Sequence, residues 1–363
     1  MKITNFRIAE LQVPLKKPFK TALRSVEYID DVVVEIHTDE GLVGYGEAAP
    51  TVVITGDSKG GITAAIRDHV APALIGLSLD APETIFGRLD GAILKNTSAK
   101  AAVDMAIYDL IGQSLGVPVY KLLGGFRDTL ETDLTISLNQ PGEMAVDAIE
   151  AVERGYKTLK IKLGKDPQLD LKRLMAVADA VGEQVSLRLD ANQGWTAKEA
   201  VRILGKIQDQ GIAIEFVEQP VAAHDFEGLK YVTDNTELAI MADESLFSPA
   251  DALKLLQVRA VDLLNIKLMK CGGINQALKI CMLAELYGVE CMVGCMLESK
   301  LSVNAAAHLA AAKSVVRYVD LDGPGLSLTD PVDGGSAFDE ARILISQSPG
   351  LGVKAVEGLH YLD

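Results

Sequence analysis

The chain has 363 residues, of which 48% are apolar and 23% charged, and its formal net charge is −15. That length suits one barrel of roughly 250 residues with an accessory domain, and the composition is that of a globular protein with ample core. The negative charge argues against nucleic acid or an anionic membrane surface as a main partner. No run of about 18 apolar residues predicts a membrane span and no secretory signal is evident, so we expect a cytoplasmic protein.

Strand patterns dominate the start of the chain. Residues 2–13 alternate weakly between apolar and polar side chains, and residues 30–50 are typical of a hairpin that turns near Asp39. Between these segments, residues 16–25 are too polar for a core strand. We therefore expect them to form a loop.

A helical pattern follows over residues 61–120. It is clearest in residues 98–115, where apolar side chains recur every three or four positions and Ser98 is a candidate N-cap. The pair Gly124 and Gly125 then predicts a break in the chain.

After this break, strand-like and helix-like segments alternate. Eight candidate strands are separated by seven helical segments, and they lie at residues 132–137, 158–163, 185–190, 214–218, 239–243, 263–268, 291–295 and 317–322. This pattern predicts an α/β fold with a (β/α)₈ barrel, a modified TIM barrel. A doubly wound sheet would also alternate, but the count of eight and the lack of a G-x-G-x-x-G motif after any strand favour the barrel.

The predicted domain boundaries follow from these patterns. Residues 1–125 are expected to form an α+β capping domain, and residues 126–327 the catalytic barrel. Residues 328–363, which are rich in Gly, Pro and Asp at their start, are expected to return to the capping domain.

Three acidic residues close three successive predicted strands, namely Asp190, Glu218 and Asp243. Their spacing is about one βα unit, so a parallel barrel would gather them on the face where active sites are built. Each one alone is more simply a helix cap or a solvated loop acid. Together they would repel one another unless a cation lay between them, and oxygen ligands suit Mg²⁺.

Polar residues near these acids are candidates for a supporting layer. Asn192, Gln193 and Glu244 follow in the same loops and are expected to hold ligands or water. Arg188 shares a strand face with Asp190 and is expected to orient its carboxylate by a charge-assisted hydrogen bond.

Two lysines share one face of a predicted strand. Lys160 and Lys162 are two residues apart, and in a barrel that face is the interior. A like charge and partial burial both favour a neutral amine, so Lys162 is a candidate general base. Alone, the pair would be read as surface lysines. Lys267, which ends a later strand, is expected to face the same centre from the far side.

Two lysines that flank one metal-bound carboxylate suit a proton transfer across a carbon. One amine would remove the α-proton, and the other would return a proton to the opposite face. Mg²⁺ would stabilise the charge of the enediolate between the two steps.

Two further features are open to more than one interpretation. Asp320 and Asp322 are either a negative pocket for a cationic group such as an α-ammonium, or a solvated turn before Gly323. Arg24 lies in a segment that an accessory domain could lay over the barrel mouth, but alone it is a surface arginine. The four cysteines lie in apolar stretches without C-x-x-C spacing, so buried free thiols are expected and a zinc site is not.

The motifs K-I-K (160–162), D-A-N (190–192), E-Q-P (218–220), D-E-S (243–245) and N-I-K (265–267) resemble the muconate-lactonizing subgroup of the enolase superfamily. The resemblance covers essentially the whole chain. It implies one Mg²⁺ per subunit on Asp190, Glu218 and Asp243, with Lys162 and Lys267 as acid/base catalysts and Lys160 assisting. Cycloisomerases, o-succinylbenzoate synthases, N-acylamino acid racemases and dipeptide epimerases all share this pattern.

A narrower resemblance is to the dipeptide epimerases, carried by residues 19–25, 51–58, 263–273, 290–300 and 320–322. It implies epimerisation of the C-terminal residue of a dipeptide, L-Ala-L-Glu to L-Ala-D-Glu, in cell-wall peptide recycling by a homo-oligomer. The implied substrate-binding residues are Arg24, Thr135, Lys160, Cys295, Asp320 and Asp322, with the two aspartates on the ammonium and Arg24 on an acidic side chain.

Other functions are less well supported by the residues. An N-acylamino acid racemase, an o-succinylbenzoate synthase or a dipeptide epimerase with another side-chain preference would use the same fold. A silent binding barrel would have no reason to keep the lysines and acids. A metal hydrolase would usually want a histidine ligand, which the chain does not offer at a suitable spacing.

Overall fold

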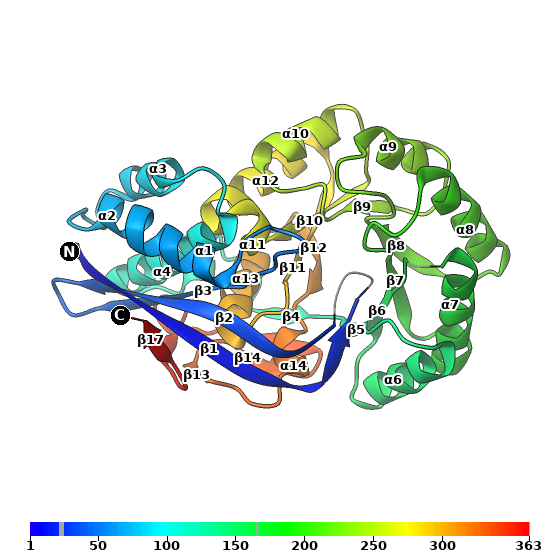
Figure 1. Cartoon of the computed structure of the whole chain (residues 1–363), viewed down its shortest axis with the longest axis horizontal. Helices are drawn as coiled ribbons and strands as arrows, with labels where there is room; N and C mark the ends of the chain where they lie inside the picture. The colour runs from blue at the N-terminus through cyan, green and yellow to red at the C-terminus, as the bar shows by residue number, and fades with distance from the viewer. Residues whose placement is uncertain (22–24, 165, 363) are drawn as a thin grey trace.

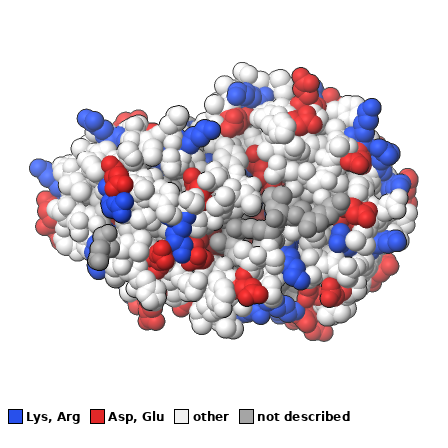
Figure 2. All heavy atoms as spheres, viewed as in Figure 1, with Lys and Arg blue, Asp and Glu red and all other residues white. Residues whose placement is uncertain are grey.

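A computed structural model describes residues 1–21, 25–164 and 166–362. An antiparallel sheet with several helices forms one end of the molecule, and a ring of strands surrounded by helices forms the other (Figure 1). Lysine, arginine and acidic side chains are interspersed over both parts of the face shown in Figure 2. Within the described residues, no helix is both long and apolar enough to cross a bilayer.

The capping sheet combines the two ends of the chain. Its strands are antiparallel and lie in the order β17 (His360–Leu362), β1 (Ile3–Lys20), β2 (Ser25–Thr38) and β3 (Val43–Ala48). The hairpin between β2 and β3 turns where the sequence predicts it. The final strand pairs with β1, which brings the tail back to the N-terminal sheet.

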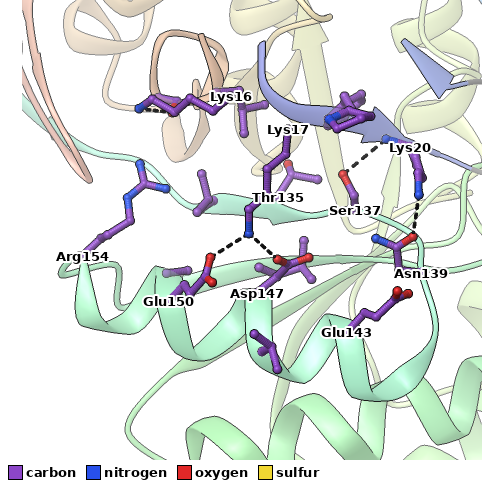
Figure 3. A pocket seen from close by; sticks show the side chains of 18 of the residues that line it. Lys16, Lys17, Lys20, Thr135, Ser137, Asn139, Glu143, Asp147, Glu150 and Arg154 are labelled. Carbon is purple, nitrogen blue, oxygen red and sulfur yellow. Dashed lines mark hydrogen bonds and ion pairs between the residues drawn. The ribbon is translucent and has the colours of Figure 1, made fainter. Parts of the chain in front are cut away.

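Residues 16–20 form a strand, so the predicted loop over residues 16–25 is wrong in this part. After an irregularity between Pro14 and Phe19, β1 pairs again with β2 as far as Lys20. The lysines of this segment bond to polar groups outside the sheet: Lys16 Nζ donates to Gly325 O, Lys20 Nζ donates to Asn139 Oδ1, and Lys17 contacts helix α6 (Pro141–Glu153). Lys17 Nζ lies 2.8 Å from Asp147 Oδ1 and 2.7 Å from Glu150 Oε2, and Figure 3 shows this lysine reaching from the strand to the helix.

Helices cover one face of the capping sheet. They are α1 (Lys59–Ala64), the π-helix η1 (Ala65–Val70), α2 (Ala71–Leu74), α3 (Pro82–Ala92), α4 (Thr97–Leu115) and α5 (Val119–Leu123). The backbone of α4 approaches β3 closely, since a Cβ on Gly46 would lie 1.8 Å from the carbonyl oxygen of Ala102. Ser98 is not the N-cap, because the helix begins at Thr97; the Ser98 N–H instead donates to Asp57 Oδ2.

Eight parallel strands form the barrel in sequence order, which confirms the predicted fold. They are β5 (Leu134–Ile136), β6 (Thr158–Lys162), β7 (Ser186–Asp190), β8 (Ile214–Glu218), β9 (Ile240–Ala242), β10 (Leu263–Lys267), β11 (Glu290–Gly294) and β12 (Val316–Asp320). The ring is completed between β12 and β5 by single hydrogen bonds, such as Leu321 N to Thr132 Oγ1 at 2.8 Å. A doubly wound sheet is excluded, because its strand order would reverse.

Helices on the outside of the barrel follow the strands. They are α6, α7 (Pro167–Val181), α8 (Ala197–Asp209), α9 (Phe226–Asp234), α10 (Pro249–Gln257), α11 (Leu268–Cys271), α12 (Ile274–Tyr287) and α13 (Lys300–Ala312). After β12 only the four-residue α14 (Gly323–Leu326) follows.

The tail contacts both parts of the molecule. It contains β13 (Val332–Gly334), β14 (Ala337–Asp339), β15 (Arg342–Leu344) and β16 (Val353–Val356). Strand β15 pairs with β4 (Thr129–Glu131), just before the barrel, whereas β17 pairs with β1. The domain boundaries after residues 125 and 327 stay a prediction.

A buried histidine joins α13 to the capping part. The Tyr120 N–H donates to His308 Nδ1 at 3.1 Å, and the imidazole is fully buried. Burial lowers the pKa of His308 to about 3, so the ring is neutral in the folded chain at all but strongly acidic pH.

This histidine should make stability depend on pH. Between pH 6.5 and 3 the unfolded chain binds a proton that the folded chain does not. His308 therefore contributes a loss of unfolding free energy as pH falls through this range, at most about 1.4 kcal/mol per pH unit. Urea unfolding at pH 7 and pH 5 measures the loss. His308→Asn keeps an acceptor but cannot titrate, and it should show a smaller loss; an equal loss in both proteins would contradict the assignment.

Candidate active site at the barrel mouth

Strand register places the predicted acids and lysines on one ring. Lys162 on β6 is paired with Asp190 on β7, which is paired with Glu218 on β8. On the other side Lys267 on β10 is in register with Gly294, which is in register with Asp320 on β12. Asp243 directly follows β9, between these two rows. The spacing of one βα unit thus brings these residues to one face.

Lys162 and Lys267 contact the acids from two separate strands. Lys162 Nζ donates to Asp190 Oδ2 at 2.6 Å, and Lys267 Nζ donates to Asp243 Oδ2 at 2.9 Å. Strands β7, β8 and β9 separate the two lysines along the ring. Lys162 and Lys267 therefore flank the row of carboxylates.

Lys160 lies one layer deeper in the barrel than Lys162 and forms ion pairs with three acids of the charged cluster. Its Nζ is 2.7 Å from Glu218 Oε2, 2.7 Å from Asp320 Oδ2 and 3.2 Å from Asp190 Oδ2. Burial acts to lower the pKa of Lys160, but the charges of Asp320, Glu218 and Asp190 outweigh it, and the pKa lies well above its ordinary value. Lys160 is therefore a fixed cation beneath the acids.

Two buried residues of this cluster were not assigned a role from the sequence. Asn265 Nδ2 donates to Glu218 Oε1 at 2.7 Å, and Lys270 Nζ donates to both the carbonyl and Oδ1 of Asp243. Both flank Lys267, and Asn265 shares its strand face, which is the signal that could have identified it. Gly294 leaves room for Asn265 and Lys267, because a Cβ there would lie 2.8 Å from Asn265 Oδ1 and 3.1 Å from Lys267 Cε.

The predicted supporting residues divide into two groups. Asn192 belongs to the site, since its N–H donates to Asp190 Oδ1 at 2.9 Å and its Nδ2 to Glu244 Oε1 at 3.3 Å. Gln193 instead accepts a hydrogen bond from Ala223 N in the next loop. Gln193 thus connects loops and does not contact the acids.

The predicted contact between Arg188 and Asp190 is wrong. Arg188 Nη1 donates to Asp133 Oδ2 and its Nε to Glu215 Oε2, both at 2.7 Å. Two residues before Asp190, the side chain lies one layer further from the barrel mouth, where Asp133 is the nearer acid. Arg188 therefore stabilises the base of the charged cluster.

Left-handed backbone follows two of the acids. Asn192, Gln193 and Gln219 have φ values of 43°, 65° and 37°. Such conformations cost free energy in residues other than glycine and concentrate at functional sites. Gln219 holds its turn through its side chain, whose Oε1 accepts from the N–H groups of Asp243 and Ser245.

One pocket brings the remaining predicted residues together. Its barrel lining includes Thr135, Lys160, Lys162, Lys267, Cys295, Asp320 and Asp322, and its capping lining includes Phe19, Thr21, Val53 and Ile54. The Thr135 N–H donates to Asp322 Oδ2 at 2.7 Å. Burial, with Asp320 nearby, raises the pKa of Asp322 to about 6. Arg24 lies outside the described residues.

The chemistry of the cluster suits a divalent cation. Among the described residues at the mouth, six carboxyl groups (Asp190, Glu218, Asp243, Glu244, Asp320 and Asp322) face four ammonium groups (Lys160, Lys162, Lys267 and Lys270). The carboxyl groups outnumber the ammonium groups, so a divalent cation would add positive charge where acidic groups are in excess. Glu244 Oε2 and Asn192 Oδ1 are buried without a hydrogen-bond donor in the described part. Burial and Asp243 raise the pKa of Glu244 to about 8.

Asp190, Glu218 and Asp243 are each paired with at least one lysine ammonium. In the part of the chain that the structure describes, no three acidic, histidine or cysteine side chains are already arranged to hold a metal ion. Asp190, Glu218 and Asp243 each offer oxygen ligands within the same ring, however. These three residues could hold Mg²⁺, and their role as ligands stays a prediction.

Asn265 should affect metal binding through Glu218. Asn265→Ala removes the donor to Glu218 Oε1, and losing such a supporting contact typically weakens metal affinity by about 10- to 100-fold. Calorimetric titration with Mg²⁺ measures this change. Asn304→Ala is the matched control, because Asn304 is an equally buried asparagine that bonds Leu351 O and Ser336 N away from the site. Equal Mg²⁺ affinity in both variants would contradict the role of Asn265.

Comparison with known proteins agrees with this geometry. Residues 143–358 match the enolase C-terminal domain-like family, and residues 3–124 match the N-terminal domain of the mandelate racemase / muconate lactonizing enzyme family. An L-Ala-D/L-Glu epimerase of Clostridium acetobutylicum is 56% identical over 98% of this chain and 99% of its own length.

Two solved structures are also similar over nearly their whole length. The substrate-liganded L-Ala-D/L-Glu epimerase of Bacillus subtilis is 50% identical with a TM-score of 0.97, over 98% of this chain and 99% of that one. A dipeptide epimerase of Enterococcus faecalis, complexed with Mg and L-Leu-L-Tyr, is 44% identical with a TM-score of 0.95, over 98% of this chain and 100% of that one. The chain belongs to the mandelate racemase / muconate lactonizing enzyme family of the enolase superfamily.

Proposed function

We propose that the chain is a Mg²⁺-dependent dipeptide epimerase that inverts the α-carbon of the C-terminal residue, with L-Ala-L-Glu to L-Ala-D-Glu as the preferred reaction. The observation that carries this proposal is the placement of Lys162 and Lys267 on either side of the acidic row. The similarity to an L-Ala-D/L-Glu epimerase along 98% of the chain supports it.

Each lysine has a clear part in such a reaction. One Nζ accepts the α-proton from one face of the carbon, and the other Nζ returns a proton to the opposite face. When bound by Asp190, Glu218 and Asp243, Mg²⁺ supplies positive charge that favours ionisation next to the substrate carboxylate. Two of these ligands also orient the lysines, because Asp190 is paired with Lys162 and Asp243 is paired with Lys267.

Asp322 is the group best suited to bind the dipeptide ammonium. Asp320 is already paired with the Lys160 ammonium at 2.7 Å, whereas Asp322 accepts hydrogen bonds from the backbone N–H and the side chain of Thr135, a neutral residue. With a pKa of about 6, Asp322 is mostly ionised at neutral pH. N-acyl amino acids lack this ammonium, which distinguishes dipeptides from the substrates of an N-acylamino acid racemase or an o-succinylbenzoate synthase.

A second candidate is an epimerase for dipeptides with apolar side chains. Phe19, Val53, Ile54 and Leu297 supply an apolar part of the pocket lining. The related Enterococcus enzyme was crystallised with L-Leu-L-Tyr. Arg24, which the sequence assigns to an acidic substrate side chain, and Cys295 are the residues that would decide between the two preferences.

The cellular setting belongs to the same proposal. Four buried free cysteines support a cytoplasmic location, where cell-wall peptides are recycled. A homo-oligomer is supported by exposed apolar side chains on α12, including Met282 and Leu286, which are 55% and 81% exposed.

Removal of either flanking lysine should separate exchange from inversion. In D₂O with Mg²⁺, the unaltered chain should incorporate deuterium at the α-carbon of L-Ala-L-Glu and form L-Ala-D-Glu. Lys162→Ala and Lys267→Ala should each lose inversion by at least about 100-fold, because each keeps a base on only one face. Mass spectrometry and chiral analysis measure both events.

Each single variant should still exchange the α-proton of just one of the two diastereomers, and the two variants should differ in which one. Lys157→Ala is the control, because this lysine is exposed and directly precedes β6, the strand that carries Lys162. Full epimerisation by either active-site variant would rule out the two-base proposal.

Asp322→Asn should distinguish dipeptides from N-acyl substrates. Loss of the charge should lower kcat/KM for L-Ala-L-Glu by about 10- to 100-fold, the usual range for a bond to a charged group. N-acetyl-L-Glu, which has no ammonium, should be affected much less. An equal decrease for both compounds would show that Asp322 does not bind the ammonium.

A further inference from the structure

The seventh barrel loop, residues 295–299, supplies part of the pocket but contains none of the groups assigned to proton transfer or metal binding. It joins β11 to α13, and Cys295, Met296 and Leu297 line the pocket together with Lys267 and Asp322. The loop also touches the loop after β12. A Cβ on Gly323 would lie 2.8 Å from the carbonyl oxygen of Glu298, so the two loops must keep this close approach.

A carboxylate from the capping sheet holds the end of this loop. Glu47 on β3 is fully buried, and its two oxygens accept three hydrogen bonds from one barrel segment. Ser299 N donates to Oε1 at 2.9 Å, Ser299 Oγ donates to Oε2 at 2.8 Å, and Ser302 N donates to Oε2 at 2.8 Å. All three donors belong to the first turn of α13 or to its N-cap, where N–H groups lack partners within the helix.

A second carboxylate, that of Glu298, links the loop to the first turn of α13. Glu298 accepts hydrogen bonds from Met296 N and from the hydroxyl of Ser302. The Ser302 N–H and hydroxyl therefore bind Glu47 and Glu298 respectively. Through Ser302, the capping sheet is linked to the backbone of Met296, in the pocket lining.

We infer that Glu47 is a positioning residue for the substrate pocket, which acts by fixing the seventh loop from the capping domain. This inference rests on the proposed epimerase function for its kinetic consequence. Without the carboxylate, three buried donors lose their acceptor and the loop is free to shift. The reacting lysines and acids lie on other strands, so the loss falls on substrate binding and leaves the proton transfers in place.

The test compares Glu47→Gln with a matched variant, Asp104→Asn. Asp104 on α4 of the capping part is also buried, and it accepts from Ile274 N and Asn275 N at the start of α12. It thus joins the capping part to a barrel helix in the same way, but the residues it holds do not line the pocket. Both variants should lower the melting temperature.

The two variants should differ in kinetics and in local dynamics. Glu47→Gln should raise KM for L-Ala-L-Glu by about tenfold, the effect of losing a bond to a charged acceptor, with kcat changed less than about threefold. Amide hydrogen exchange of residues 295–302 should become faster. Asp104→Asn should leave KM and this exchange unchanged. Ser299→Ala, which removes only the hydroxyl bond to Glu47, should shift KM and exchange in the same direction by less.

Several results would overturn the inference. They are unchanged exchange of residues 295–302 in Glu47→Gln, an equal KM change in Asp104→Asn, or a fall in kcat at constant KM. If Glu47→Gln does not fold, Ser299→Ala decides the question by the same criteria. Absence of dipeptide turnover by the unaltered chain would refute the proposed function instead, and hydrogen exchange would still test whether Glu47 fixes the loop.

Discussion

The burial of opposite charges at the mouth of the barrel is the constraint on which this structure depends. Removal of a charged group from water is costly unless a partner compensates it, and breaking a buried pair is more costly still. Lys160 meets this condition with Glu218, Asp320 and Asp190 at once. The barrel keeps these partners together because their strands are parallel and in register.

The same constraint explains why the acids are predictable from the sequence and their neighbours are not. Asp190, Glu218 and Asp243 each stand at a strand end, one βα unit apart, and the barrel topology alone brings such positions together. Arg188 also lies on the face of Asp190, but it lies deeper in the barrel, where its partner is Asp133, just before β5. The two residues are 55 positions apart, so no local pattern reveals this contact. Lys270 is similar, because its contact with Asp243 requires the turn after β10 to place it beneath the acid.

The capping part was predictable in outline only. The hairpin of β2 and β3 follows from alternation and a turn, both of which are local signals. The strand at residues 16–20 has no apolar alternation, and its lysines find partners far away in the sequence, such as Asp147 and Glu150 for Lys17. The prediction of Ser98 as the N-cap is wrong by a short distance, because the helix begins at Thr97 and the Ser98 N–H donates to Asp57, 41 residues earlier in the chain.

Carboxylates from the capping part bind the first residues of two barrel helices and so connect the capping part to the barrel. Glu47 accepts a hydrogen bond from Ser299, the N-cap of α13, and Asp104 accepts one from Ile274, the first residue of α12. The N-termini of these two barrel helices are therefore bound by acidic residues of the capping part. The barrel carries the ring of charged residues, and the capping part lines the space above it. Substrate preference can then vary through the capping residues and the seventh loop while the ring stays constant.

The most direct measurement is a crystal structure of the chain with Mg²⁺ and L-Ala-L-Glu. We expect the Nζ atoms of Lys162 and Lys267 to lie on opposite faces of the α-carbon, each within about 3.5 Å, with the substrate carboxylate towards Asp190, Glu218 and Asp243. Both amines on the same face of that carbon would contradict the account.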